Sequence, residues 1–186
     1  MSSGGLLLAL ALVGLAWPAT VSAEPRLHLV DPARSQIRFH AVSRFMDADG
    51  AFHRLAGEIR LDDGRPETAA GEVSVEVASI DTGIGMRDNH LRSADFFDAE
   101  RHPRARFVLG AVRREGERFV VSGALTLRGV TRPLTLPVAV AVSGGTIRVT
   151  GELTLNRVEF GIAYQSRLNP IRDEVTVWID LTATAR

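Results

Sequence analysis

The chain has 186 residues, which is the length of one domain with a sizeable core. Its 22 basic and 22 acidic residues cancel, so neither a basic surface for nucleic acid nor a polybasic membrane patch is indicated. The absence of cysteine excludes a thiol nucleophile, a cysteine-zinc site and a disulfide framework, and the absence of lysine excludes Schiff-base chemistry.

The N-terminal segment has the features of a secretion signal. Leu6 to Trp17 is an apolar run, shorter than the ~20 residues that a membrane-spanning helix needs. Val21-Ser22-Ala23 supplies the small residues typical of a signal-peptidase site, so we expect cleavage before Glu24. No basic residue precedes the apolar run, and a retained membrane anchor is the alternative. The expected division is a signal peptide over 1–23 and one domain over 24–186.

Most of the remaining chain alternates apolar and polar residues, the pattern of strands with one face toward a core. Turn signals such as Asp47 to Gly50 and Ser143 to Gly145 separate these runs. Leaving aside a short first run at 26–30, we expect eight strands near 35–43, 52–61, 71–80, 105–109, 119–127, 134–142, 147–155 and 175–181. Short turns imply antiparallel neighbours, and eight strands can close into a barrel. The expected fold class is therefore all-β, an eight-stranded antiparallel barrel.

One stretch departs from the strand pattern. After two glycines, Leu91, Ala94 and Phe97 follow at helical spacing. We expect one short helix here, between the strand that ends near Ile80 and the strand that starts near Arg104.

The same stretch resembles a known family. Its strings S-I-D-T-G at 79–83 and R-D-x-H-L-R-S-x-D-F-F-D at 87–98, followed by Pro103 and Phe107, are similar to a motif of the YceI family. Weaker similarities at 31–39, 123–133 and 156–161 occur in the family's order. The resemblance implies a periplasmic, lipocalin-like protein that binds a polyisoprenoid lipid and is not an enzyme.

The barrel interior could be a lipid-lined tube or a packed core, because both need apolar residues pointing inward. The resemblance favours the tube. Gly57, Gly123 and Gly151 are in phase with inward residues, so they could leave space, or they could relieve strand curvature. The residues expected to line the tube are Phe39, Phe52, Phe107 and Phe119, with Ile59, Val75, Leu125, Leu136, Leu153 and Val177 beside them.

Asp88, His90, Asp95 and Asp98 are the set most like an active site, since a histidine with carboxylates can bind a metal or shuttle protons. On a helix, however, positions 88 and 95 share a face while 90 lies far round it. Capping and surface pairing, such as Asp88 with Arg92 one turn later, explain these residues more simply. We therefore assign no catalytic residue and no metal ligand.

The expected function is binding, and transport or storage, of a prenyl quinone or prenyl phosphate, with no covalently held cofactor. Arg87, His90 and Arg92 could contact its polar head group at the mouth of the tube. A membrane protein could donate or accept the lipid, and the run 138–142, apolar on both faces, could form a homodimer contact. An enzyme using the Asp/His cluster and a filled-barrel interaction module are the alternatives.

Overall fold

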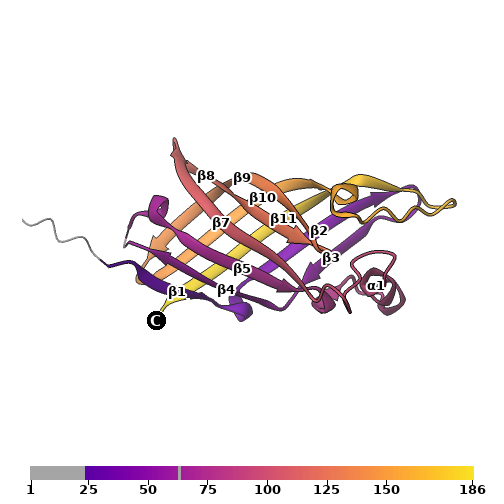
Figure 1. Cartoon of the computed structure of the whole chain (residues 1–186), viewed down its shortest axis with the longest axis horizontal. Helices are drawn as coiled ribbons and strands as arrows, with labels where there is room; N and C mark the ends of the chain where they lie inside the picture. Colours follow the sequence, from indigo (N-terminus) through magenta and orange to yellow (C-terminus); the bar gives the residue numbers. More distant parts are fainter. Residues whose placement is uncertain (1–23, 63) are drawn as a thin grey trace, which may run out of the picture.

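The computed structural model describes residues 24–62 and 64–186, so the expected signal peptide at 1–23 lies outside the described residues. The described chain forms one antiparallel sheet that curls into a barrel, with a helix at one end (Figure 1). The strands are β1 (Arg26–Val30), β2 (Gln36–Ser43), β3 (Ala48–Phe52), β4 (Leu55–Leu61), β5 (Ala70–Glu76), β6 (Ile80–Asp81), β7 (Arg104–Glu115), β8 (Arg118–Leu127), β9 (Val130–Ser143), β10 (Thr146–Asn156) and β11 (Ile171–Ala185). The helix is α1 (Gly85–Arg92), and the 3₁₀ turns are η1 (Pro32–Arg34), η2 (Pro66–Thr68), η3 (Val77–Ser79) and η4 (Arg157–Phe160).

The sheet closes through its first and last strands. Its order runs β1-β4-β5-β7-β8-β9-β10-β11, and β1 pairs with β11 as well as with β4. His28, for example, faces Ile59 on one side and Ala185 on the other. The expected eight-stranded antiparallel barrel is therefore confirmed.

Three of the eight barrel strands are each broken into two pieces. β1 and β2 lie end to end along β11, where Val30 faces Ala183 and Gln36 faces Asp180. β3 and β4 run end to end beside them, and β6 and β5 lie along β3 and β4 in turn. The run at 26–30 that we left aside is thus the first half of the first barrel strand.

The helix is shorter than the apolar spacing indicated. α1 ends at Arg92, and Ala94 and Phe97 follow it in a turn in which the Phe97 N–H donates to the Leu91 carbonyl at 3.0 Å. Phe97 reaches the barrel from this turn, with its ring edge-on to Phe52 at 5.8 Å. None of the described helices is long and apolar enough to cross a membrane.

Two of the three inward glycines, Gly57 and Gly123, lie where the backbone of a neighbouring strand approaches closely. A Cβ atom added at Gly123 would lie 2.3 Å from the Val108 carbonyl oxygen, and one at Gly57 would lie 2.5 Å from that of Glu72. The expectation that missing side chains leave space is therefore wrong for these two positions, and close strand contact explains them.

The outer face of β9 is not covered by the helix. Ala139 and Ala141 point outward and are exposed, while Val138 points into the barrel and is buried. α1 lies instead at one end of the barrel (Figure 1). A homodimer contact on this face stays a prediction.

Candidate ligand-binding cavity

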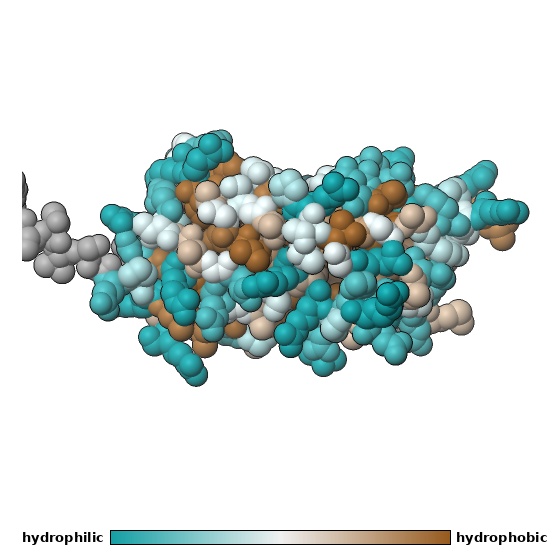
Figure 2. Space-filling model, viewed as in Figure 1, coloured by the Kyte–Doolittle hydropathy of each residue, from teal (hydrophilic) through white to brown (hydrophobic). Residues whose placement is uncertain are grey.

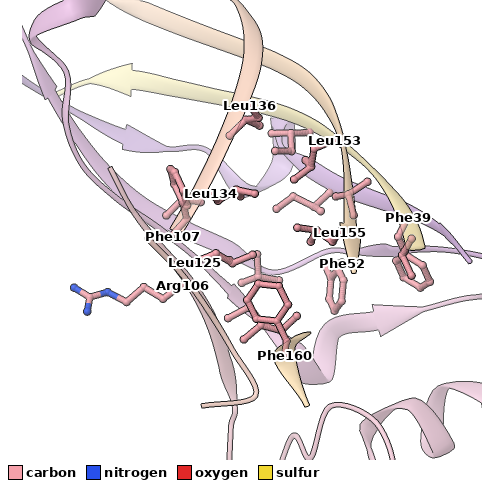
Figure 3. Close-up of a pocket in the computed structure, with 18 of the residues that line it drawn as sticks. Phe39, Phe52, Arg106, Phe107, Leu125, Leu134, Leu136, Leu153, Leu155 and Phe160 are labelled. Atoms are coloured by element: carbon pink, nitrogen blue, oxygen red, sulfur yellow. The ribbon is translucent and has the colours of Figure 1, made fainter. Parts of the chain in front are cut away.

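The barrel encloses a continuous cavity of about 530 Å³. This volume lies within the ~300–1,000 Å³ that small-molecule sites occupy. Inward residues of β2 to β5 and of β7 to β11 line it, and most of them are aliphatic or aromatic (Figure 3). Arg106 on β7 is also part of this wall, but it points away from the cavity and pairs with Glu72 outside.

Nine of the ten apolar residues expected in the lining are there. They are Phe39, Phe52, Ile59, Val75, Phe107, Leu125, Leu136, Leu153 and Val177. The tenth, Phe119, does not line the cavity, because it is packed against Val121, Leu136 and Val138 near the β7–β8 turn. The Arg114 guanidinium lies 4.9 Å from the centre of its ring.

The middle of the barrel is hollow. Val149 and Ile179 contact two separate buried apolar clusters, one around Val30 and Leu55 and the other around Phe119. Both residues point inward but are only partly buried, because the cavity lies in front of them. A packed core would bury residues at the centre of the sheet, so the structure contradicts the filled-barrel alternative.

Aromatic side chains gather at the end of the cavity near α1. His90 from α1 lies edge-on to Phe96 and to Tyr164, with ring centres 4.9 Å apart in both cases. Phe96 and Tyr164 are themselves 4.8 Å apart. All three line the cavity, so this cluster forms part of its mouth, between α1 and the loop that precedes β11.

The two arginines expected at the mouth are engaged by protein groups. Arg87 lines the cavity, but it donates to the Thr82 hydroxyl at 2.8 Å, to the Thr82 carbonyl at 3.0 Å and to the Asp47 carbonyl at 3.3 Å. Arg92 does not line it, because it donates to the carbonyls of Ala78 and Ile80 at 2.9 and 2.7 Å. The structure therefore brings Arg87 and His90 to the mouth, but not Arg92.

A buried arginine holds the mouth loop in place. Arg157 is only 6% exposed and donates to the carbonyls of Ile162 and Tyr164, at 2.6 and 3.0 Å. It also donates to the carbonyls of Ile171 and Arg172 and to the Asp173 carboxylate, at 3.0 to 3.1 Å. Burial lowers the pKa of Arg157, and the Asp173 charge opposes that shift.

Two residues of the mouth, Tyr164 and Arg157, are not among those that the sequence analysis assigns to the site. Tyr164 is the only tyrosine of the chain and lies in the irregular segment 156–172, where no periodicity indicates which side chains face inward. Asn156-Arg157 belongs to the family-like string, and that string was the one signal that could have pointed to Arg157.

The Asp/His set is dispersed in the structure. Asp88 is buried and accepts hydrogen bonds from the Thr82 N–H and hydroxyl, at 2.9 and 2.6 Å. The expected pairing of Asp88 with Arg92 is therefore wrong, since Thr82 takes its place.

Of the four residues in this set, His90 and Asp95 are in contact, at 3.1 Å, because Asp95 lies beyond the end of the helix. Asp98 is buried elsewhere and has Arg101 at 3.6 Å. Across residues 24–62 and 64–186, no three His, Cys, Asp or Glu side chains are grouped so that they could hold a metal ion.

Known proteins are similar to this chain in sequence and in fold. The family model of the YceI-like domain matches residues 29–183. The chain is 42% identical over 87 residues to UPF0312 protein plu2095 of Photorhabdus laumondii, covering 47% of this chain and 45% of the relative. It is 38% identical over 87 residues to Protein YceI of Escherichia coli O157:H7, covering 47% and 46%. These alignments span less than half of the curated relatives.

Solved structures match over more of the chain. BcnA of Burkholderia cenocepacia superposes with a TM-score of 0.76 at 29% identity, covering 83% of this chain and 99% of that one. A polyisoprenoid binding domain from Saccharophagus degradans superposes with a TM-score of 0.70 at 18% identity, covering 88% and 100%. The match over residues 29–183 shows that the chain belongs to the family of YceI-like domains.

Proposed function

We propose that this protein binds a polyisoprenoid-type amphiphile whose apolar tail lies in the barrel cavity. The observation on which this depends is the cavity of about 530 Å³ with its continuous apolar lining. The domain from Saccharophagus degradans, which has the same fold, is described as polyisoprenoid binding, and that description agrees with this proposal.

The shape of the cavity suits a chain-like ligand. Inward residues of β9 line it from Leu134 to Val142, a distance of roughly 26 Å along the strand at ~3.3 Å per residue. Transfer of each methylene-sized group of a tail out of water is worth ~0.8 kcal/mol. Affinity would therefore grow with tail length until the cavity is full, and the tail would supply most of it.

The polar end of the ligand would lie at the mouth, where the lining is polar but has little free charge. The side chains there include those of His90, Tyr164, Ser166 and Asn169. Arg87 and Arg157 are the cations of the lining at this end, and both guanidiniums already donate to backbone carbonyls. A buried phosphate would need charged donors, so an uncharged quinone head group fits this mouth better than a prenyl phosphate.

The role we propose is transport or storage of the lipid in the periplasm, after removal of residues 1–23. It needs no bond-making step and no covalent cofactor. The dispersal of Asp88, His90, Asp95 and Asp98 supports binding over catalysis.

Displacement of a fluorescent apolar probe from the purified protein tests this proposal. A prenyl quinone should displace the probe, and it should do so at about tenfold lower concentration than a prenyl phosphate of the same tail length. Failure of both lipids to displace the probe, and to remain bound after gel filtration, would contradict the function. Tighter binding of the phosphate would contradict the head-group assignment.

A further inference from the structure

Large apolar side chains are exposed around the mouth of the barrel. Phe45 and Met46 in the β2–β3 turn are 72% and 62% exposed, and Leu168 in the loop before β11 is 82% exposed. We call these three residues the apolar tip. Apolar residues protrude at this end of the molecule, on the right in Figure 2.

Hydrogen bonds hold the two halves of the apolar tip together. The Phe45 N–H donates to the Asn169 side-chain carbonyl at 2.9 Å, and the Asn169 amide donates to the Ser43 hydroxyl at 3.0 Å. The Arg44 N–H donates to the Pro170 carbonyl at 3.1 Å. The turn and the loop therefore form one unit that fixes the exposed side chains beside each other.

The apolar tip is continuous with the cavity. Met46 lines the cavity as well as being exposed, and Ser43, Ser166 and Asn169 around it are also part of the lining. The lining of the cavity therefore runs from the apolar interior of the barrel, through its polar mouth, to the exposed Met46 side chain. Exposed apolar patches of this kind mark interaction sites.

Two more large apolar residues are exposed beside α1, at the same end of the barrel as the apolar tip (Figure 1). Ile84 and Met86, at the start of α1, are also exposed large apolar residues. Arg87 joins this part of the chain to the β2–β3 turn, through its hydrogen bond to the Asp47 carbonyl.

The opposite end of the barrel is different in character. There the β7–β8 turn is charged, with Arg113, Arg114, Glu115, Glu117 and Arg118 in sequence around Gly116. In the part of the chain that the structure describes, the turns at this end expose no large apolar side chain. The asymmetry places the apolar tip where the ligand would enter.

Two arginines flank the apolar tip. The Arg44 guanidinium lies 5.0 Å from the centre of the Phe45 ring, and the exposed Arg167 directly precedes Leu168. Basic residues beside protruding apolar ones suit the interface of an anionic bilayer, where the apolar groups enter the acyl region and the cations meet lipid phosphates.

We propose that the apolar tip, with Arg44 and Arg167, docks this protein on the surface of an anionic lipid bilayer. This inference rests on the proposed function in one respect: docking at the mouth lets an apolar tail pass between membrane and cavity without crossing water. The docking itself needs no bound ligand, so it can be tested separately.

Flotation with vesicles of phosphatidylethanolamine and phosphatidylglycerol tests the docking. The wild-type protein should float with these vesicles, and the variant F45S/L168S should bind them about tenfold more weakly, which corresponds to ~1.4 kcal/mol. Val108→Ser is the matched control, because Val108 is an exposed apolar residue on the wall of the barrel, away from the mouth. It should bind as the wild type does.

A second measurement does not depend on how well the double variant folds. Because the chain has no cysteine, a single Leu168→Cys variant can carry an environment-sensitive dye, with Val108→Cys as its control. The dye at position 168 should shift its emission to the blue when vesicles are added, and the dye at 108 should not.

Three results would overturn the proposal: absence of wild-type flotation, equal flotation of F45S/L168S, or equal dye shifts at both positions. Displacement of the apolar probe by a prenyl quinone in detergent, on the same proteins, separates this inference from the proposed function. Normal displacement with no flotation would reject the docking alone, and flotation with no displacement would support the docking and reject the ligand.

Discussion

Filling the middle of the cavity should block the ligand and leave the fold intact. Val149 is the position to change, because it contacts both buried clusters, is only partly buried and lines the cavity. At ~30 Å³ per water-sized group, a cavity of about 530 Å³ holds roughly 18 methylene-sized groups. Val149→Trp adds roughly 90 Å³ of side chain, which is the space of about three of them.

The size of the effect follows from the lost contacts of the tail. Three methylene-sized groups at ~0.8 kcal/mol each are worth ~2.4 kcal/mol. A flexible tail can shift and recover part of this loss, so we expect binding of a prenyl quinone to weaken about tenfold. The melting temperature should stay the same or rise, because the ring fills space that is open in the wild type.

The matched control is Val138→Trp in the same wall. Val138 also belongs to the cavity lining, but it is only 3% exposed and is packed between Phe119 on β8 and Gly151 on β10, so it has no open space in front of it. Overpacking at such a site costs ~1–3 kcal/mol, so this variant should melt several degrees lower. Probe displacement and thermal melting of both variants check the expectation. A V149W protein as destabilised as V138W, or one that binds the quinone normally, would refute the hollow barrel as the binding site.

Three further predictions concern the mouth and the pH dependence of stability. Arg157→Met should lower the free energy of unfolding by ~3 kcal/mol in chemical denaturation, since it removes a buried guanidinium that donates to four carbonyls and a carboxylate; an unchanged midpoint would contradict this. Tyr164→Ala should raise the rate of ligand release about tenfold in stopped-flow experiments, because it opens the aromatic mouth, and an unchanged rate would place the exit elsewhere. Arg148 donates to both oxygens of Asp180, at 3.0 and 2.9 Å, and holds the pKa of Asp180 below its usual range. The pair therefore stabilises the fold above about pH 4, and this contribution is lost as the pH falls through the lowered pKa. Asp180→Asn should lower the free energy of unfolding by under ~1 kcal/mol at pH 7, because the pair is exposed. The melting temperature of this variant should also fall less steeply than that of the wild type as the pH is lowered below about 4; the same pH dependence in both proteins would show that the pair contributes nothing.

Strand periodicity predicted the barrel because each strand has one face in a single apolar interior. The inward set of β9, which includes Leu136 and Val138, and that of β10 could be assigned from alternation alone. Alternation did not show that the segments before and after Asp31-Pro32 belong to one barrel strand. Asp31 does cap the turn η1, but β2 after the turn continues along β11, as β1 does before it. Only pairing with a strand about 150 residues away determines that direction.

The cavity and its mouth depended on contacts that no local pattern encodes. Apolar alternation is the same for a hollow and a packed barrel, so Phe119 was assigned to the lining although it packs in the wall. At the mouth, Arg157 and Tyr164 owe their positions to hydrogen bonds and ring contacts across an irregular segment. The helix prediction overran its end because Phe97, at helical spacing, meets the barrel from a turn.

Native mass spectrometry of the protein, purified without detergent from cells that make prenyl quinones, tests the central claim most directly. The account predicts a population heavier than the polypeptide by the mass of one isoprenoid lipid, which organic extraction releases and identifies. The V149W variant should lack that population. A wild-type protein that carries only the polypeptide mass, and that stays so after incubation with a prenyl quinone, would contradict the account.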